Sequence, residues 1–318
     1  MSTPTADPLA ALADLPGVPA AIAEARSAVD RLRGHRVLRS RSAEVTAESA
    51  LRGSRASAAL AGADWPLEEL RRRTDFGNGA DAAPVRGALR ISAELSSLLP
   101  VFRQAPAQAL TRLHMLAAAG AVPADRIGRP RMPGEPAEAE PGWATGAPSK
   151  PETTDSGPAD GSAGAAASQP SERLEAPADS GAPSIALTPL SPVPAEAAAQ
   201  RLGALTGILA APGSAPALVV AAVSLGESLC ACPFGWGDGL VGRAVFRLAL
   251  AARGLDPQSL AVPEAGMVEL GPQARQEALT GYASGTAAGL SGWIAFCARA
   301  LELGALESTA VCEALMRG

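Results

Sequence analysis

Residues 232–243 read CPFGWGDGLVGR, and this stretch decides the fold prediction. Its glycines crowd one loop that leads directly into an apolar segment with helical character. Glycines let successive backbone N–H groups turn toward one point, and a helix N-terminus adds about half a positive charge. The stretch therefore predicts a loop that binds an anion such as phosphate, with Arg243 as a second contact from the first turn of the next helix. The alternative is a tight turn between two helices that holds no ligand.

Apolar residues recur at helical spacing on both sides of this loop. Gly53 is expected to interrupt the first long helical stretch, and Trp65-Pro66 to form a turn. No run with the two-residue alternation of a strand is present, so the expected fold class is all-α. The pattern predicts helices over 18–50, a second stretch ending at 73, 89–102, 107–119, 195–211, 215–230, 240–254, 272–283, 289–303 and 306–316.

Composition excludes several classes of protein. The chain has 318 residues, 47% of them hydrophobic but only 3% aromatic, and a net charge of −5, which argues against nucleic acid as a partner. No apolar run approaches the ~20 residues of a membrane span, and the N-terminus lacks the pattern of a signal peptide. Four cysteines are too few for a disulfide framework, and their spacing is not that of a zinc site. We therefore expect a cytoplasmic protein with no metal held by the loop.

A change in composition divides the chain. Residues 132–184 are rich in Pro, Gly, Ala and Ser, and hold nine acids against two basic residues, a net charge of −7. Such a segment buries too little apolar surface to offset the entropy of ordering, so it is predicted to be a disordered linker. A spacer is the favoured role, with partner binding as the alternative. The flanks are an N-terminal helical region, 1–131, and a helical core, 185–318.

The 232–243 stretch resembles the active-site motif of Fic (Fido-domain) proteins, His-Pro-Phe-x-(Asp/Glu)-Gly-Asn-Gly-Arg-x-x-Arg. Pro233, Phe234, Gly237, Gly239 and Arg243 match it in register. The helices expected before and after the motif match the family's layout as well. The linker falls where the family has a β-hairpin flap that clamps the target peptide. The resemblance implies a Fido-like helical domain formed by both flanks of the linker.

A second segment resembles the family's inhibitory helix, whose motif is Ser/Thr-x-x-x-Glu-Gly. Residues 57–62 read SAALAG, so Ser57 and Gly62 match and Ala61 stands where the family has its glutamate. The resemblance implies a regulatory segment over 54–70. It also implies a role for each motif residue: Cys232 at the position of the catalytic base, and Phe234, Gly235, Gly237, Asp238, Gly239 and Arg243 around a nucleotide phosphate.

Fic enzymes transfer AMP from ATP to a protein hydroxyl, and this sequence lacks the polar residues for that reaction. Cys232 replaces the general-base histidine, and a thiol with a pKa of ~8.5 is a poor base at neutral pH. Trp236 replaces the acid that holds Mg²⁺, so Mg²⁺ binding is not expected. Leu240 replaces an arginine, and Asp238 adds a negative charge where phosphates would lie.

Two hypotheses follow. In the first, the protein is a catalytically impaired Fido-like binding or regulatory module that retains ATP or another nucleotide or anion and acts on an unidentified protein partner. In the second, it is a diverged transferase that moves AMP or another phosphate-containing group onto a protein hydroxyl. We favour the first, because several polar roles are lost together. The sequence leaves open whether the chain forms a homodimer.

The remaining polar residues have structural explanations that we favour over chemical ones. Cys232 as a nucleophile is the alternative to a buried cysteine, but neither histidine of the chain, His35 or His114, is placed beside it by the sequence. His114 lies in an apolar run and is expected to be structural. Packing explains the single tyrosine, Tyr282. Arg71–Arg73 are expected to be a solvated helix end rather than a phosphate contact.

Overall fold

The computed structural model describes residues 7–138 and 193–317, and every regular element in these ranges is helical. This confirms the all-α fold class. Most of the predicted linker, with the short segment 185–190 that precedes the next helix, lies outside the described residues. The elements are η1 (Ala10–Asp14), α1 (Val18–Arg33), α2 (Leu38–Leu60), α3 (Leu67–Arg72), α4 (Ala82–Gln104), α5 (Pro106–Ala118), η2 (Ala124–Arg126), α6 (Ala195–Ala210), α7 (Ala217–Ala231), α8 (Asp238–Ala252), α9 (Pro263–Ala283) and α10 (Ala287–Arg317).

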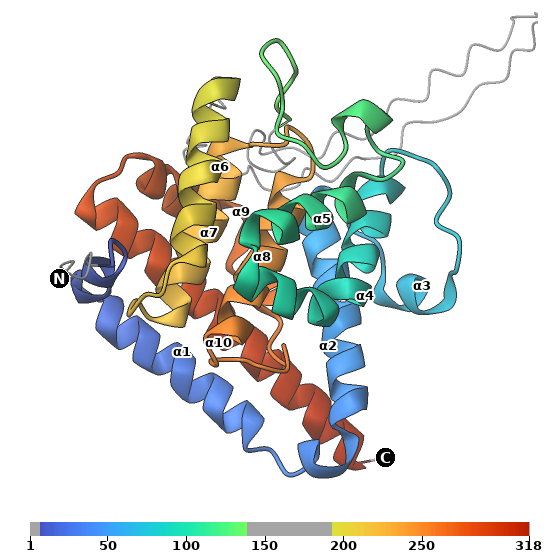
Figure 1. Ribbon diagram of the computed structural model, residues 1–318. Helices are drawn as coiled ribbons and strands as arrows, with labels where there is room; N and C mark the ends of the chain where they lie inside the picture. Colours follow the sequence, from blue (N-terminus) through green and yellow to red (C-terminus); the bar gives the residue numbers. More distant parts are fainter. Residues whose placement is uncertain (1–6, 139–192, 318) are drawn as a thin grey trace, which may run out of the picture.

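The hairpin of α7 and α8 lies at the centre, with helices from both ends of the chain around it (Figure 1). Helix α8 is buried along its whole length except for its last residue, Ala252. A helix that is buried on all sides needs other elements to cover every face. Helices α4 and α5 cover α8 on one side, and α7 also contacts α6, α9 and α10.

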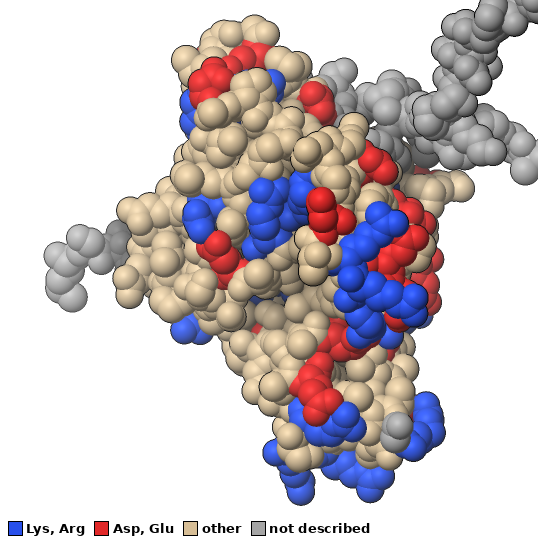
Figure 2. Space-filling model, turned by 90° about the vertical axis from the view of Figure 1, so that its right-hand side faces the viewer, with Lys and Arg blue, Asp and Glu red and all other residues tan. Residues whose placement is uncertain are grey.

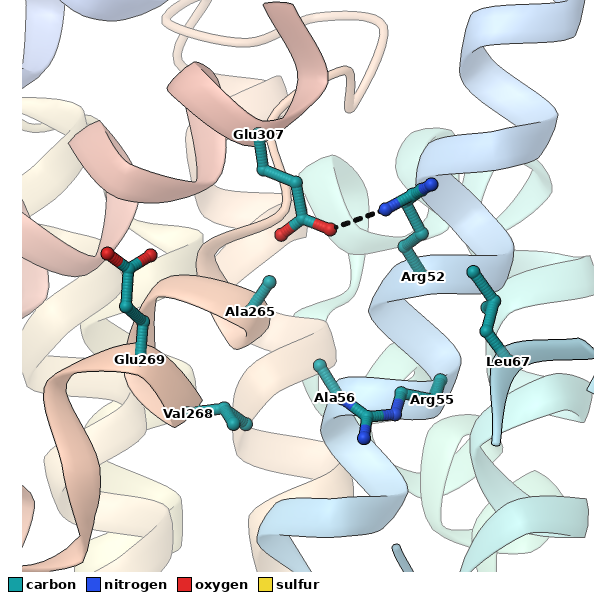
Figure 3. A pocket seen from close by; sticks show the side chains of 8 residues that line it. All are labelled: Arg52, Arg55, Ala56, Leu67, Ala265, Val268, Glu269 and Glu307. Atoms are coloured by element: carbon teal, nitrogen blue, oxygen red, sulfur yellow. Dashed lines mark hydrogen bonds and ion pairs between the residues drawn. The ribbon is translucent and has the colours of Figure 1, made fainter. Parts of the chain in front are cut away.

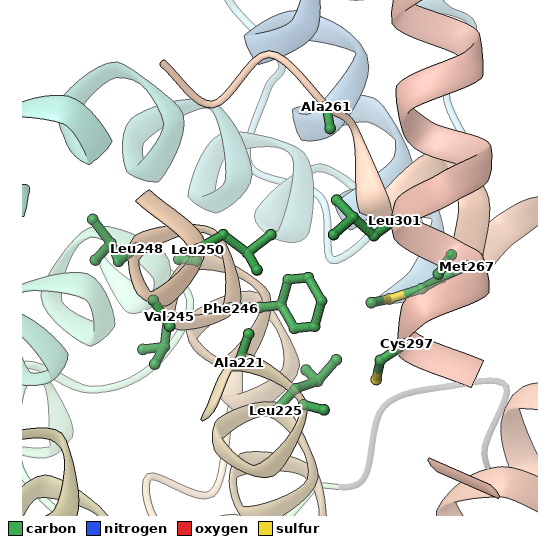
Figure 4. Close-up of a cluster of buried hydrophobic side chains, with 14 of the residues drawn as sticks. Ala221, Leu225, Val245, Phe246, Leu248, Leu250, Ala261, Met267, Cys297 and Leu301 are labelled. Atoms are coloured by element: carbon green, nitrogen blue, oxygen red, sulfur yellow. The ribbon is translucent and has the colours of Figure 1, made fainter. Parts of the chain in front are cut away.

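Phe246 marks the middle of the core. Its ring is fully buried and points from α8 toward Met267 of α9 and Leu301 of α10, with Leu225 of α7 nearby (Figure 4). Because the chain has few aromatic residues, most of the surrounding volume is filled by Leu, Val and Ala. Small side chains allow the helices to approach closely.

Two glycines that were expected to end helices lie inside them instead. Helix α2 continues through Gly53, and α10 runs unbroken past Gly304, where two helices over 289–303 and 306–316 were predicted. A Cβ at Gly304 would lie 2.2 Å from the Val262 carbonyl oxygen. Glycine is therefore needed there for close contact between backbones, although it is an unfavourable residue in an isolated helix.

Helix α9 begins earlier than predicted. Pro263 occupies its first turn, where the missing N–H of proline costs nothing. The chain leaves helical geometry at Gly271, with φ 85°, and resumes at the predicted start, Pro272. The pattern located the second half of α9 and missed the first.

The N-terminal helices share the core of the C-terminal ones. Helix α1 packs on α10, and α2 packs on α4, α8 and α9. The Trp65-Pro66 step lies between α2 and α3, as predicted. Both flanks of the linker therefore build one helical body.

The face formed around α2, α3 and α4 carries mixed charge rather than a patch of one sign (Figure 2). Arg71 at the end of α3 forms hydrogen bonds of 3.0 and 3.1 Å to Glu48, and Arg73 pairs with Glu69 at 3.1 Å. These pairs agree with the structural interpretation of Arg71–Arg73. Among the described helices, none combines the length and the apolar character needed to cross a bilayer.

Candidate functional site: the loop between α7 and α8

The loop that joins α7 to α8 turns through three left-handed residues. Cys232 has φ 44°, Gly235 φ 79° and Gly237 φ 71°. A Cβ at Gly235 would lie 2.5 Å from the Pro136 carbonyl oxygen, so this position admits only glycine without movement of the chain. Gly237 is the N-cap of α8, and the helix begins at Asp238, two residues before the predicted start.

The Asp238 side chain folds back onto the loop that was predicted to bind an anion. Its Oδ1 accepts a hydrogen bond from the Phe234 N–H at 3.0 Å, and its Oδ2 accepts one from the Gly235 N–H at 2.8 Å. The carboxylate is 4% exposed and lies at the positive end of α8. The protein therefore supplies its own anion at the place where a phosphate was expected.

A second segment, residues 131–138, lies over the loop. The Arg131 N–H donates to the Pro233 carbonyl at 2.8 Å, and the Glu138 N–H donates to the Gly235 carbonyl at 2.8 Å. These two bonds hold the segment against the loop. The carbonyls of Pro233 and Gly235 are thus used internally.

The Arg131 side chain completes this cover. Its buried guanidinium donates to the carbonyls of Ala231 and Cys232 at the C-terminal end of α7, and to the carbonyl of Val193. A cation at a helix C-terminus is favoured by the helix dipole. Arg131 belongs to the described range 7–138, and Val193 is the first residue of the range 193–317. The Arg131 side chain therefore connects the two described parts of the chain beside the loop.

His114 of α5 stacks on the ring of Phe234, with ring centroids 4.3 Å apart. Its Nδ1 accepts a hydrogen bond of 2.9 Å from the Gly128 N–H. Burial lowers the pKa of His114 to about 4, against an opposing effect of the Trp236 backbone. A neutral, stacked imidazole that holds the loop in place agrees with the structural role expected for His114.

The Cys232 thiol is buried and hydrogen-bonded to the backbone of α7. The side chain is 4% exposed, and Sγ donates to the Leu229 carbonyl at 3.2 Å. A thiolate at this place would face the carbonyl end of α7, which carries partial negative charge. The geometry agrees with a buried structural cysteine.

Arg243 contacts the segment that resembles an inhibitory helix. Its Nε donates to Ser57 Oγ at 2.8 Å, and an Nη donates to the Ser57 carbonyl at 2.9 Å. Arg243 is 3% exposed and lies in the second turn of α8, not the first as predicted. The structure thus brings together the two motifs that the sequence singled out 186 residues apart.

Ala61 and Gly62 end helix α2. Ala61 is its C-cap, and Gly62 follows in a left-handed conformation with φ 90°. Ala61 presents a methyl group at the position where the resembling motif has a carboxylate, and the acceptors that Arg243 uses on α2 include the hydroxyl and the carbonyl of Ser57. Gly239 lies buried in the first turn of α8 and takes part in helix packing.

Leu240 and Trp236 occupy apolar places. Leu240 is 2% exposed and packs closely on α4. A Cβ added at Gly87 of α4 would lie only 3.2 Å from Leu240 Cδ1. Trp236 is half-buried and packs against the hydrophobic core. Both positions, which in the resembling motif carry an arginine and a metal-binding acid, here hold apolar side chains that pack against the core.

A buried ion pair next to Arg243 was not anticipated. Arg247, one turn further along α8, has Nη1 3.7 Å from Glu264 Oε2, and both side chains are almost completely buried. Burial raises the pKa of Glu264. Helical spacing from Arg243 places Arg247 on the same face, which is the one signal in the sequence that could have predicted it.

Gly53 makes room for this pair. A Cβ at Gly53 would lie 2.4 Å from Arg247 Nη1. A cavity of about 20 Å³, close to the volume of one water molecule, remains among Gly53, Ser57, Leu240, Arg247 and Glu264.

Among residues 7–138 and 193–317, no three His, Cys, Asp or Glu side chains gather closely enough to hold a metal ion. No protein-family model matches the sequence, and no curated protein matches it. The structure does match a solved one: a Fic family protein from Desulfovibrio desulfuricans G20, 16% identical, over 92% of this chain and 74% of that chain, with a TM-score of 0.59.

The chain has the Fic fold. The match extends over both flanks of the linker, which confirms the fold that the motif resemblance implied. At 16% identity the likeness concerns the fold, and the chemistry of the Fic motif has to be argued from this chain's own residues.

Proposed function

We propose that this chain is a Fic-fold protein that does not transfer AMP and acts by binding another protein. The observation that carries the proposal is the Asp238 carboxylate on the N–H groups of Phe234 and Gly235. An α-phosphate in the same place would have to displace a carboxylate that is already well bonded. It would also lie beside that negative charge, which costs further free energy.

The space around the motif supports the same conclusion. The cavity beside Ser57, Leu240 and Glu264 has a volume of about 20 Å³, whereas pockets for small ligands have volumes of roughly 300–1,000 Å³. Segment 131–138 is hydrogen-bonded to two carbonyls of the loop and lies against it. A transferase needs an open cleft for both the nucleotide and a target side chain.

The competing hypothesis of nucleotide binding is tested by isothermal titration of the full chain with ATP and with ADP, with and without Mg²⁺. We expect no heat of binding up to millimolar nucleotide. Two variants serve as controls: Gly237→Glu, which places a side chain in the loop, and Arg243→Ala, which removes the motif arginine. Binding by the wild-type chain that both variants weaken would overturn the part of the proposal that denies nucleotide binding.

Transfer is tested separately, because weak nucleotide binding and catalysis are different claims. The chain is incubated with ATP labelled on the α-phosphate, Mg²⁺ and a mixture of cellular proteins. We expect no labelled protein above the level obtained with Gly237→Glu. Label that depends on an intact loop would support the diverged transferase instead. Analytical ultracentrifugation then shows whether a second copy of the chain is the protein partner.

A further inference from the structure

Two arginine–glutamate pairs lie against different faces of helix α2, and they differ in distance. On one face, Arg52 Nη1 of α2 donates to Glu307 Oε1 of α10 at 2.9 Å, the contact drawn as a dashed line in Figure 3. On the face that carries Gly53, Arg247 Nη1 of α8 lies 3.7 Å from Glu264 Oε2 of α9. The first contact is a direct hydrogen bond, whereas the second distance is too long for one.

The longer pair is also the more buried one. The side chains of Arg52 and Glu307 are 31% and 33% exposed, so solvent can complete their hydrogen bonding. Those of Arg247 and Glu264 are 7% and 4% exposed. Among the described residues, Arg247 Nε and Glu264 Oε2 are buried and have no hydrogen-bond partner. A buried polar atom without a partner is strongly destabilising, so this pair needs a further hydrogen-bonding group.

A small cavity lies beside the buried pair. Its lining includes Arg247, Glu264 and Gly53, and a Cβ at Gly53 would lie 3.5 Å from Glu264 Oε2. The volume is about 20 Å³, and one water molecule needs roughly 10–15 Å³ of such space. The missing side chain at Gly53 therefore leaves room for one very small molecule next to both charged groups.

The charges around the cavity favour a neutral occupant. Arg247 and Glu264 have opposite signs, and so do Arg243 and Asp256, the other charged groups that act on Glu264. A small anion would be repelled by the carboxylate, and a small cation by the guanidinium. The occupant has to accept a hydrogen bond from nitrogen and donate one to oxygen, and water is a molecule of this size that does both.

We propose that this cavity binds one ordered water molecule that bridges Arg247 and Glu264. The water oxygen accepts from an N–H of Arg247, and the water donates one proton to Glu264 Oε2. The Ser57 hydroxyl also lines the cavity and supplies a third polar partner. Buried waters have two to four such partners. Because water both donates and accepts, it suits the ionised and the protonated carboxyl of Glu264 alike.

The bridging water connects segments from both flanks of the linker. Gly53 and Ser57 belong to α2 in the N-terminal region, whereas Arg247 and Glu264 belong to α8 and α9 of the helical core. The inference goes beyond the proposed function, since it concerns how α2 is held beside the motif helix and not what the motif binds. The water is then a structural component of the contact between these helices.

The test is a water–protein NOE experiment on the full chain with isotope-labelled alanine methyl groups. Ala88 and Ala244 line the cavity and are 4% and 3% exposed, so bulk water does not reach their methyl groups. We expect a cross-peak between each of these methyl groups and the water signal. Ala221 is buried in the core and does not line the cavity, so its methyl group should show none.

A serine hydroxyl that exchanges its proton with solvent produces the same cross-peak, and a second measurement excludes this source. Relaxation dispersion of the water oxygen nucleus counts long-lived water molecules and does not detect hydroxyl groups. Ala244→Val adds two methyl groups at the cavity and should lower this count by one. Ala252→Val, the same substitution at the half-buried last residue of α8, is the matched control and should leave the count unchanged.

A high-resolution crystal structure then gives the position of the water oxygen, which we expect at about 2.6–3.2 Å from Glu264 Oε2 and from a nitrogen of Arg247. Three results would each overturn the proposal: no cross-peak at Ala88 and Ala244 in the wild type, an unchanged count in folded Ala244→Val, or a direct Arg247–Glu264 hydrogen bond in place of the water. The wild-type cross-peaks test the proposal even where Ala244→Val does not fold. The nucleotide titrations are unaffected by such a failure, because the Asp238 contacts with the loop do not involve this cavity.

Discussion

Arg243 of the motif helix donates to Ser57 Oγ at 2.8 Å and so ties the central helix α8 to the N-terminal helix α2. Both side chains are buried, at 3% and 7% exposed. The contact joins two segments that resemble the functional and the inhibitory motifs of Fic proteins. In this chain it is a packing contact of the core, and it does not depend on a glutamate at Ala61.

Ser57→Ala should lower the free energy of unfolding by about 1.5–3 kcal/mol, since it removes one hydrogen-bond acceptor from a buried guanidinium. Chemical denaturation measures the change. Ser96→Ala, an exposed serine on α4, is the matched control and should change stability by less than about 0.5 kcal/mol. Equal effects of the two substitutions would show that the Ser57 hydroxyl contributes nothing to the contact.

Asp238→Ala should expose the N–H groups of Phe234 and Gly235 and should cost about 1–3 kcal/mol of stability. Inorganic phosphate or sulfate should then raise the melting temperature of the variant and leave that of the wild type unchanged, because only the variant has an open anion site. Thermal denaturation over a series of phosphate concentrations measures both effects.

The control for this experiment is Asp81→Ala. Asp81 is exposed at the N-cap of α4 and makes no side-chain cap there. Its removal should leave the response to phosphate unchanged. Stabilisation of the wild type to the same degree as Asp238→Ala would show that the carboxylate does not block the loop.

Leu240→Arg should destabilise the chain by about 3 kcal/mol or more, although it restores a residue of the Fic motif. The side chain lies in the core against α4, and an arginine there would be buried beside a carboxylate, Glu264, that is already paired with Arg247. Leu240→Met, which preserves volume, should cost less than about 1.5 kcal/mol. For the same reason, the combined substitutions Cys232→His, Trp236→Asp, Asp238→Asn and Leu240→Arg should fail to create AMP transfer. Label on a target protein from a folded combined variant would contradict this.

Stability should fall as the pH decreases from about 6.5 to about 4 because of His114. Its pKa is lowered from 6.5 in the unfolded chain to about 4 in the folded one, so the unfolded state binds the proton more readily. The contribution is fully present above pH 6.5 and is lost as the pH falls through this interval, and the total loss of stability is about 3 kcal/mol. Protonation of Nδ1 would also break the hydrogen bond from Gly128.

His114→Gln isolates this contribution, since glutamine does not titrate and still offers an acceptor. Urea denaturation from pH 4 to pH 8 gives the unfolding free energy of both proteins. The value for the wild type minus the value for the variant should decrease as the pH falls from 6.5 toward 4. A difference that is constant over this interval would show that His114 is not buried in its neutral form.

Much of the fold could be predicted because the spacing of apolar residues over a few turns of chain indicates a helix. The apolar periodicity located most of the helices, and the glycine-rich stretch marked the junction of α7 and α8 correctly. Several errors concerned helix ends: the stretch 18–50 is divided between α1 and α2, the first half of α9 was missed, and two glycines were misjudged. Gly53 and Gly304 have no local feature that distinguishes a helix break from a close contact, and only the neighbours Arg247 and Val262 decide between the two.

The candidate site was predicted in part. The sequence identified Asp238 as an unfavourable charge for phosphate, and Arg243 and Ser57 as members of two motifs. It did not predict that Asp238 would bind the loop's own N–H groups, or that Arg131 would cap α7 across the linker. These contacts depend on side-chain direction and on segments far apart in the chain, neither of which residue types specify.

The sequence by itself therefore determined the helical class, the position of the loop and the residues that differ from the motif it resembles, since each follows from residue types over a few turns of chain. The tertiary structure alone decided what those residues contact. A carboxylate can repel a ligand or take its place, and a buried arginine can bind phosphate or a serine. Which of these occurs depends on the atoms that packing brings within about 3 Å. In this protein, Asp238 accepts from the N–H groups of its own loop, and Arg243 donates to Ser57 of its own helix α2.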